Sequence, residues 1–343
     1  MKRRSEILVG SSAPALGTTA LARVSAGHSE ALLERSPAPA FRKAHFRFAL
    51  VHTFATLLLL LVGGLVTSRD AGLAVPDWPT SYGRWWFIPM PGNVLYEHGH
   101  RLVAQLVGLL TIVHMTWMLR RETRAWLRWA SVAMLAAVIV QGVLGGITVK
   151  YYLPPAVSVA HGCFAQLFLC LSIAVSYFLS REWILGEPAM APEAVGLRRT
   201  GGRLFGVVLA QLLLGAIVRH TASALVIPDF PLSLGRVVPP LEDPKVAVHF
   251  AHRAGALVVL LTVIGYWVRL ARSRDFAARL TGPAASVALL VLLQVALGAF
   301  TVLTKTRWDI ASLHQFNGAL ILGCCAFLVL RSCRLRLRKA EVG

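Results

Sequence analysis

The chain alternates between long apolar stretches and short polar segments. Eight stretches are almost free of charge: 48–66, 102–119, 126–149, 157–179, 204–218, 247–268, 284–303 and 310–330. Most of them approach the ~20 residues that cross a hydrocarbon core as a helix. The stretch 204–218 is short and is expected to extend over Gly201 and Gly202. We therefore predict eight transmembrane helices, with seven as the alternative count.

Composition and charge support this class and give it an orientation. Hydrophobic residues make up 56% of the chain and charged residues 15%, whereas soluble domains carry about a quarter charged residues. The net charge of +19 gathers in 1–47, 120–128, 181–203, 269–279 and the segment after 330, which fall on one side of an eight-helix path. This distribution argues against a nucleic-acid partner. By the positive-inside rule it predicts a multi-pass protein of the cell (inner) membrane with both termini cytoplasmic, in contact with lipid headgroups.

Several short motifs occur twice in the same order. Residues 76–79 (Pro-Asp-Trp-Pro) recur as 228–231 (Pro-Asp-Phe-Pro), and His100-Arg101 recurs as His252-Arg253, both at an offset of 152. Gln141, Leu144 and Gly145 recur as Gln294, Leu297 and Gly298, and His161 recurs as His314, at an offset of 153. Each half therefore contains four spans and keeps one membrane orientation. The predicted fold is an all-α integral membrane protein in which two tandem four-helix bundles are related by a pseudo-twofold axis along the membrane normal.

The repeat also sets the domain boundaries. We expect a disordered cytoplasmic tail at 1–47, for which a transit peptide is the alternative interpretation. An amino-terminal four-helix bundle at 48–180 and a cytoplasmic linker at 181–203 follow. A carboxy-terminal bundle at 204–331 and a basic cytoplasmic tail at 332–343 complete the chain.

Four histidines stand at corresponding places in this repeat. His100, His161, His252 and His314 each lie near the start of a span that runs inward from the outer surface, so they share one depth. A single interfacial histidine is usually a hydrogen-bonded structural residue. Four at equivalent positions favour ligation of two heme irons, since bis-imidazole ligation needs facing histidines from two helices. His114, by contrast, falls near the cytoplasmic end of its span and is interpreted as structural.

Charged neighbours distinguish the two predicted sites. Arg101 and Arg253 follow two of the histidines and are candidates for pairing with heme carboxylates, with snorkelling to lipid headgroups as the alternative. Glu97 lies one helical turn before His100, whereas the equivalent position in the second half is His249. A carboxylate beside a buried macrocycle can move protons, so Glu97 is the candidate catalytic residue; a solvated loop-end role is its alternative. This difference predicts one site for chemistry and one for electron transfer.

The combined motifs resemble the heme A synthase family. The resemblance is carried by residues 70–79, Glu97-x-x-His100-Arg101, residues 141–149, His161, the second Pro-Asp-aromatic-Pro motif, His252-Arg253 and His314. It covers about 48–330, nearly everything but the tails. Many members carry a cysteine pair in the first outer loop, where this chain has Val75 and Ser81. A thiol-based role of that loop is therefore not expected here.

The resemblance implies an activity and assigns the sites. A methyl group of heme O would be oxidised to the formyl group of heme A by successive hydroxylations, for cytochrome oxidase biogenesis. His100 and His161 would flank the substrate heme O, with Glu97 important for turnover, and His252 and His314 would ligate a heme B cofactor. Expected partners are heme O synthase, cytochrome oxidase assembly factors and an electron donor or acceptor; a homo-oligomer is left open. The alternatives are a diheme b-type cytochrome that only transfers electrons and a heme transporter or chaperone.

Overall fold

The computed structural model describes residues 41–186 and 188–334, excepting the side chains of residues 274 and 275. Within them the chain is helical: α2 (Lys43–Ser68), α3 (Asn93–Arg121), α4 (Ala125–Lys150), α5 (Pro155–Phe178), α6 (Arg181–Leu185), α7 (Pro192–His220), α8 (Pro244–Ala271), α9 (Arg274–Leu303) and α10 (Trp308–Arg331). Eight of these helices are long and apolar enough to cross a membrane, and only the five-residue α6 is not. The prediction of an all-helical membrane protein with eight spans is confirmed.

Two predicted boundaries shift. Helix α2 begins at Lys43, so residues 43–47, which we expected in the disordered tail, are helical. Helix α7 begins at Pro192, so it includes the second part of the predicted linker together with Gly201 and Gly202. Proline at the first helical position is favourable because its missing N–H has no partner there in any case. Residues 1–40 and 335–343, the larger part of both predicted tails, lie outside the described residues.

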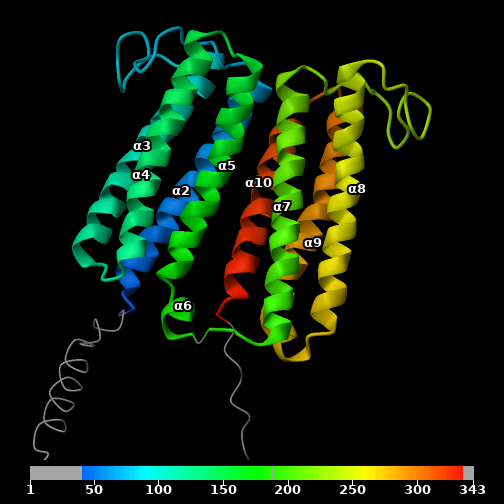
Figure 1. Cartoon of the computed structure of the whole chain (residues 1–343). Helices are drawn as coiled ribbons and strands as arrows, with labels where there is room; N and C mark the ends of the chain where they lie inside the picture. The colour runs from blue at the N-terminus through cyan, green and yellow to red at the C-terminus, as the bar shows by residue number, and fades with distance from the viewer. Residues whose placement is uncertain (1–40, 187, 335–343) are drawn as a thin grey trace, which may run out of the picture. The chain divides into compact units, whose positions relative to one another are not determined.

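The helices form two rings of four. Helix α2 contacts α3, α3 contacts α4, α4 contacts α5, and α5 closes the ring on α2; helices α7, α8, α9 and α10 close a second ring in the same way. Helices α2 and α5 pack against α10, and α5 also packs against α7, so these four helices form the seam between the rings (Figure 1). This arrangement is consistent with the tandem repeat that the sequence predicts.

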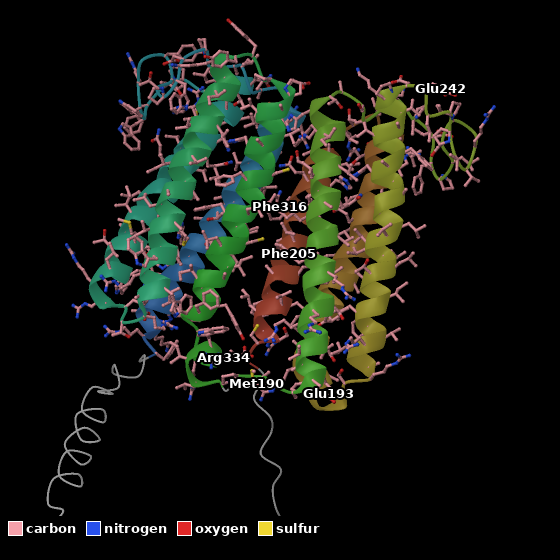
Figure 2. All side chains as sticks on the ribbon, viewed as in Figure 1. Met190, Glu193, Phe205, Glu242, Phe316 and Arg334 are labelled. Carbon is pink, nitrogen blue, oxygen red and sulfur yellow. The ribbon has the colours of Figure 1, made fainter. Side chains whose placement is uncertain are left out.

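Each ring has its own apolar core. Phe168, Met118 and Leu127 lie at the centre of the first ring, and Leu322 and Leu270 at the centre of the second. Side chains project between the helices along their length (Figure 2). Large aliphatic side chains also cover the outside of the spans, as expected where lipid replaces water: Val51, Leu58, Leu109, Leu261, Ile264 and Leu292 are examples.

Two long loops lie at one end of the rings, called here the loop-bearing end. They join α2 to α3 and α7 to α8, and the short α6 lies at the opposite end (Figure 1). The loops share local structure, since isolated β-bridges join Ser81 to Arg84 and Ser233 to Arg236 at the repeat offset. Gly83 and Gly235 lie within the turns that these bridges close, with φ of +72° and +73°, a conformation that favours glycine.

Candidate functional site

The four predicted histidines lie in the first three turns of α3, α5, α8 and α10. All four helices begin at the loop-bearing end (Figure 1). The structure therefore brings His100, His161, His252 and His314 to a common level below the two loops, one pair in each ring. Each pair comes from helices on opposite sides of its ring, as two axial ligands of one heme require.

Each of these imidazole rings packs against a glycine of the preceding helix. A Cβ atom added to the glycine would lie 3.2 Å from His100 at Gly63, 3.2 Å from His161 at Gly145, 2.9 Å from His252 at Gly215 and 3.1 Å from His314 at Gly298. Ordinary Cβ contacts are longer, so a larger residue would push the ring away. The glycines therefore allow close approach of the helices and fix where the rings stand.

The second ring shows the geometry of a pair most directly. The ring centres of His252 and His314 are 6.5 Å apart, and the ring planes are inclined by 82°. A metal about 2 Å from one nitrogen of each imidazole would separate the ring centres by roughly 6 Å. In the first ring, His100 and His161 also lie close enough to interact electrostatically. The spacing of the second pair thus fits one iron atom between the two rings.

The donor set fits a heme better than a bare metal ion. The Nδ1 atoms of His161 and His314 are buried and have no hydrogen-bond partner. In the described part of the chain, no group of three or more His, Cys, Asp or Glu residues could hold a metal ion. Heme iron needs only two protein ligands because the macrocycle supplies the other four. Two-histidine sites in the rings therefore match a heme.

Glutamines hold three of the four histidine helices in place. The side-chain amide of Gln141 donates to the backbone carbonyl of His161 at 2.9 Å, and Gln294 donates to that of His314 at 3.0 Å. Gln211 donates to the carbonyl of His252 at 2.7 Å and lies 3.1 Å from its Nδ1. The position equivalent to Gln211 in the first half is Leu59, so His100 lacks such an amide. The two halves therefore differ in the hydrogen bonds that hold this histidine helix.

Glu97 is buried and connects helix α3 to the first loop. Its Oε1 accepts from Arg101 at 2.6 Å, and its Oε2 accepts from the backbone N–H of Val75 at 2.7 Å. Arg101 also donates to the carbonyls of Asp77 and Thr80, at 2.6 and 2.5 Å. This network is called here the first-loop latch. A solvated loop-end position for Glu97 does not agree with its burial.

The second half has a weaker version of the same contacts. Arg253 lies 3.3 Å from the Nε2 atom of His249 and donates to the carbonyls of Ile227 and Leu232 at 2.8 and 2.9 Å. Arg253 and Arg101 therefore both anchor loops through carbonyl oxygens. Pairing with heme carboxylates, which the sequence indicated for these two arginines, stays a prediction, and the structure gives both guanidinium groups other partners.

The first loop is also held internally and against the ring. Asp77 accepts from the backbone N–H groups of Tyr82 and Gly83 and from the hydroxyl of Thr80. Partial burial alone would raise the pKa of Asp77, but these hydrogen bonds lower it to about 2, so the carboxylate stays ionised near neutral pH. The indole of Trp78 packs on Gly146 of α4, where a Cβ atom would come within 2.6 Å of the ring. These contacts fix the loop above the first ring.

A second histidine cluster lies nearer the opposite end of the first ring. His52 and His114 approach each other at 3.3 Å between their Nδ1 atoms, and Thr111 lies 3.0 Å from the Nε2 atom of His52. His45 stacks on Trp117, with ring centres 4.9 Å apart. The equivalent residues of the second ring are Leu197, Leu204 and Tyr266. The internal contacts of this cluster agree with the structural interpretation of His114.

Comparisons with known proteins identify the family. A sequence model of the family described as cytochrome oxidase assembly protein matches residues 90–326. A heme A synthase of Symbiobacterium thermophilum is 33% identical over 75% of this chain and 85% of its own length. This chain belongs to the heme A synthase family. Two further relatives are heme A synthases. That of Shouchella clausii is 30% identical over 75% of this chain and 86% of its own length. That of Halalkalibacterium halodurans is 27% identical over 82% of this chain and 95% of its own length.

The sequence of this heme A synthase family member indicated the four histidines, but not all of the glycines and glutamines that contact them. Gln141, Gln294, Gly145 and Gly298 stood out as repeated motifs, although their contact with histidine was not foreseen. The pair Gly63 and Gly215 could have been found in the same way, because it recurs at the offset of 152. Gln211 could not, because a leucine occupies its repeat position.

Proposed function

We propose that this enzyme oxidises a methyl group of heme O to the formyl group of heme A. The observation that carries the proposal is the match to heme A synthases over most of the chain. The range 90–326 that the family model matches contains all four histidines. The description of the family as cytochrome oxidase assembly protein supports a role of this reaction in that assembly. Two successive hydroxylations of the methyl carbon, each a two-electron oxidation that requires an external oxidant, give an alcohol and then a gem-diol, which loses water to leave the aldehyde.

The two rings hold different hemes in this proposal. The first ring holds the substrate heme O between His100 and His161, and the second ring holds a heme B cofactor between His252 and His314. Bound heme B supplies a redox-active iron. The asymmetry of the latches supports this division, because among the described residues a buried carboxylate lies beside the first pair and a histidine takes its place beside the second.

The protein's own residues bind, orient and enclose the reacting group. The glycines that face the four imidazoles and the glutamine hydrogen bonds fix the rings before any heme enters, which lowers the entropy lost on binding. The first-loop latch keeps the loop closed over the substrate site and limits water there. Glu97 lies one turn from His100 and can accept or return a proton at its carboxylate when the contact with Arg101 or Val75 loosens.

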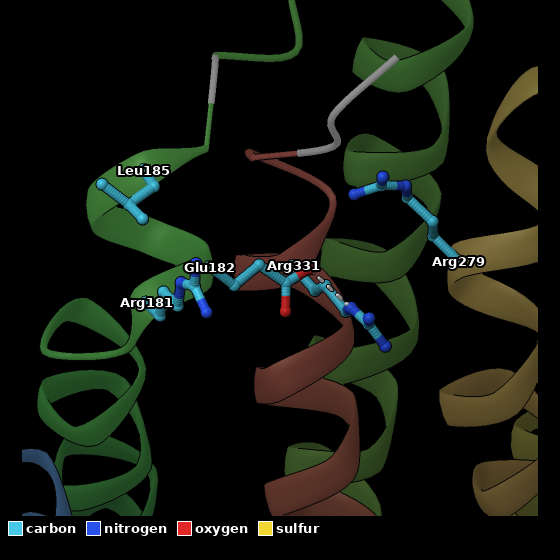
Figure 3. A pocket seen from close by; sticks show the side chains of 5 residues that line it. All are labelled: Arg181, Glu182, Leu185, Arg279 and Arg331. Atoms are coloured by element: carbon cyan, nitrogen blue, oxygen red, sulfur yellow. Dashed lines mark hydrogen bonds and ion pairs between the residues drawn. The ribbon is translucent and has the colours of Figure 1, made fainter. Parts of the chain in front are cut away.

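The proposed orientation places the loop-bearing end outside the cytoplasm. Glu242 lies at that end, whereas Arg334 and Glu193 lie at the opposite end (Figure 2). Arg181, Arg279 and Arg331 line a pocket at the opposite end, where Arg331 also pairs with Glu182 at 2.9 Å (Figure 3). Clustered guanidinium groups at this depth suit the cytoplasmic leaflet, where anionic lipid headgroups are available.

Reporter fusions test this orientation in the cell (inner) membrane. Fusions after Arg121, Gly186 and Arg274 are expected to give cytoplasmic signals, and fusions after Gly92 and Asp243 external ones, because the positive-inside rule retains the basic segments. Alkaline phosphatase reports fusion sites outside the cytoplasm, and green fluorescent protein reports fusion sites inside it. An external signal at Gly186 would contradict the proposed path of the chain.

The proposed partners are heme O synthase, cytochrome oxidase assembly factors and an electron donor or acceptor.

Co-expression with heme O synthase in cells that make no heme A tests the activity. We expect heme A among the extracted pigments, identified by mass, and only heme O when this chain is omitted. An electron-transfer cytochrome or a heme transporter with the same histidines would bind heme but form no aldehyde, so this result separates the three functions.

A further inference from the structure

Arg219 places a charge in the seam between the rings, where Asp70 acts on it electrostatically without forming a direct ion pair. It lies in the last turn of α7, and one terminal nitrogen, Nη2, donates to the carbonyl of Gly64 at 3.1 Å and to the hydroxyl of Ser68 at 2.7 Å. Among the residues that the structure describes, no carboxylate forms an ion pair with it. A guanidinium group at membrane depth is costly unless an anion or several polar groups compensate it.

The position of Arg219 relates it to the second pair of histidines. It follows Gly215 by four residues, so both share one face of α7, and Arg219 lies one turn nearer the loop-bearing end. Gly215 is the glycine against which His252 packs. Arg219 is also close enough to His314 for its charge to act on that ring. The guanidinium therefore stands at the edge of the site between the two imidazoles, on its outer side.

The repeat shows that this cation belongs to one site only. The position equivalent to Arg219 in the first half is Thr67, whose hydroxyl donates to its own helix at Gly63. Arg101 and Arg253, the other arginines near the histidines, are engaged by loop carbonyls. The Nε and Nη1 atoms of Arg219 make no hydrogen bond with any described residue. Two donors and a positive charge are thus available at the second site.

We propose that Arg219 binds a carboxylate of the heme held between His252 and His314. A porphyrin of the b type brings two carboxylates into the ring, and the planar guanidinium suits a bidentate hydrogen bond to one of them. The same residue reaches Gly64, which adjoins the glycine supporting His100. Arg219 therefore connects the cofactor heme to the helix that carries part of the substrate site. This inference rests on the proposed function, because it requires a heme in the second ring.

The midpoint potential of the bound heme tests the assignment. A nearby cation stabilises reduced iron, so Arg219→Gln is expected to shift the potential of the purified protein to more negative values with the low-spin spectrum retained. Arg219→Lys keeps the charge and should shift it less. Arg307→Gln is the matched control, because it removes an exposed arginine at the same end that already pairs with Asp309. It should leave the potential unchanged.

Ser68→Ala separates heme binding from a merely structural role. This variant removes the 2.7 Å hydrogen bond but leaves the cation, so it should keep the wild-type potential. Equal shifts in Ser68→Ala and Arg219→Gln, or no shift in Arg219→Gln, would overturn the inference. A shift seen in phosphatidylglycerol vesicles but not in lipid-free detergent would assign the anion to a lipid phosphate instead. If the wild-type protein held no heme at all, the proposed function would fail together with the inference.

Discussion

Replacing His252 or His314 by alanine is expected to remove the tightly held heme from the purified protein. The wild-type protein should show a low-spin b-type spectrum, because two imidazoles give a strong axial field. The 6.5 Å separation of the two ring centres leaves room for one iron with a ligand on each side. Loss of one ligand leaves iron five-coordinate and the macrocycle held on one face only. Absorption spectra of the purified variants, normalised to protein, measure the effect.

His45→Leu is the matched control for these variants. It also removes a buried histidine, and the second ring carries Leu197 at the same place, so the substitution suits the packing of such a ring. The control should retain the full spectrum. If His252→Ala and His314→Ala both kept the wild-type spectrum, the assignment of heme B to the second ring would be wrong.

Replacing Glu97 by alanine should leave heme B bound and strongly impair the formation of heme A. A group that transfers protons in a reaction contributes about 10²–10⁴-fold to the rate. The alanine also removes the acceptor for Val75 and Arg101, so the first loop loses its latch. Heme O, or the half-oxidised alcohol, should accumulate in the variant. Mass analysis of hemes extracted after co-expression with heme O synthase quantifies the loss.

Two further variants separate the charge of Glu97 from its place in the latch. Glu97→Gln keeps the shape but can satisfy only one of the two donors, Val75 or Arg101, through its single oxygen. Glu97→His reproduces the arrangement of the second half, where His249 lies beside Arg253. Both should retain heme B and lose most of the activity, whereas His249→Ala should affect mainly the potential or retention of heme B. Near-normal output of heme A from Glu97→Ala would exclude a catalytic role for this carboxylate.

The sequence predicted the fold because the apolar stretches and the repeat are strong signals. The sequence did not predict the first residues of α2 and α7. These helices begin at Lys43 and Pro192, inside segments rich in charged residues. There the helix extends beyond the apolar stretch, so hydropathy alone cannot place its first residue. The common level of the histidines followed from the alternating direction of the spans, and the structure agrees with it.

The contacts of the charged residues could not be predicted in the same way. Arg101 and Arg253 follow histidines in the sequence, but the loops fold back and offer them carbonyl oxygens. Such contacts depend on the three-dimensional path of residues more than twenty positions away. The positions equivalent to Arg219 and Gln211 in the first half are Thr67 and Leu59, so the repeat gave no sign of a charge or an amide there. The roles of these two residues became apparent only from the structure.

Oxidation of heme O by the purified protein tests the central claim most directly. The protein, loaded with heme B and reconstituted with heme O and a redox partner, should convert the added pigment first to the alcohol and then to the aldehyde. Mass spectra of the extracted hemes should show both products in that order, and Glu97→Ala should show neither at a comparable rate. The protein could instead retain heme O and form no oxidised product while its low-spin heme spectrum stays intact. That result would contradict the proposed activity and favour an electron-transfer cytochrome.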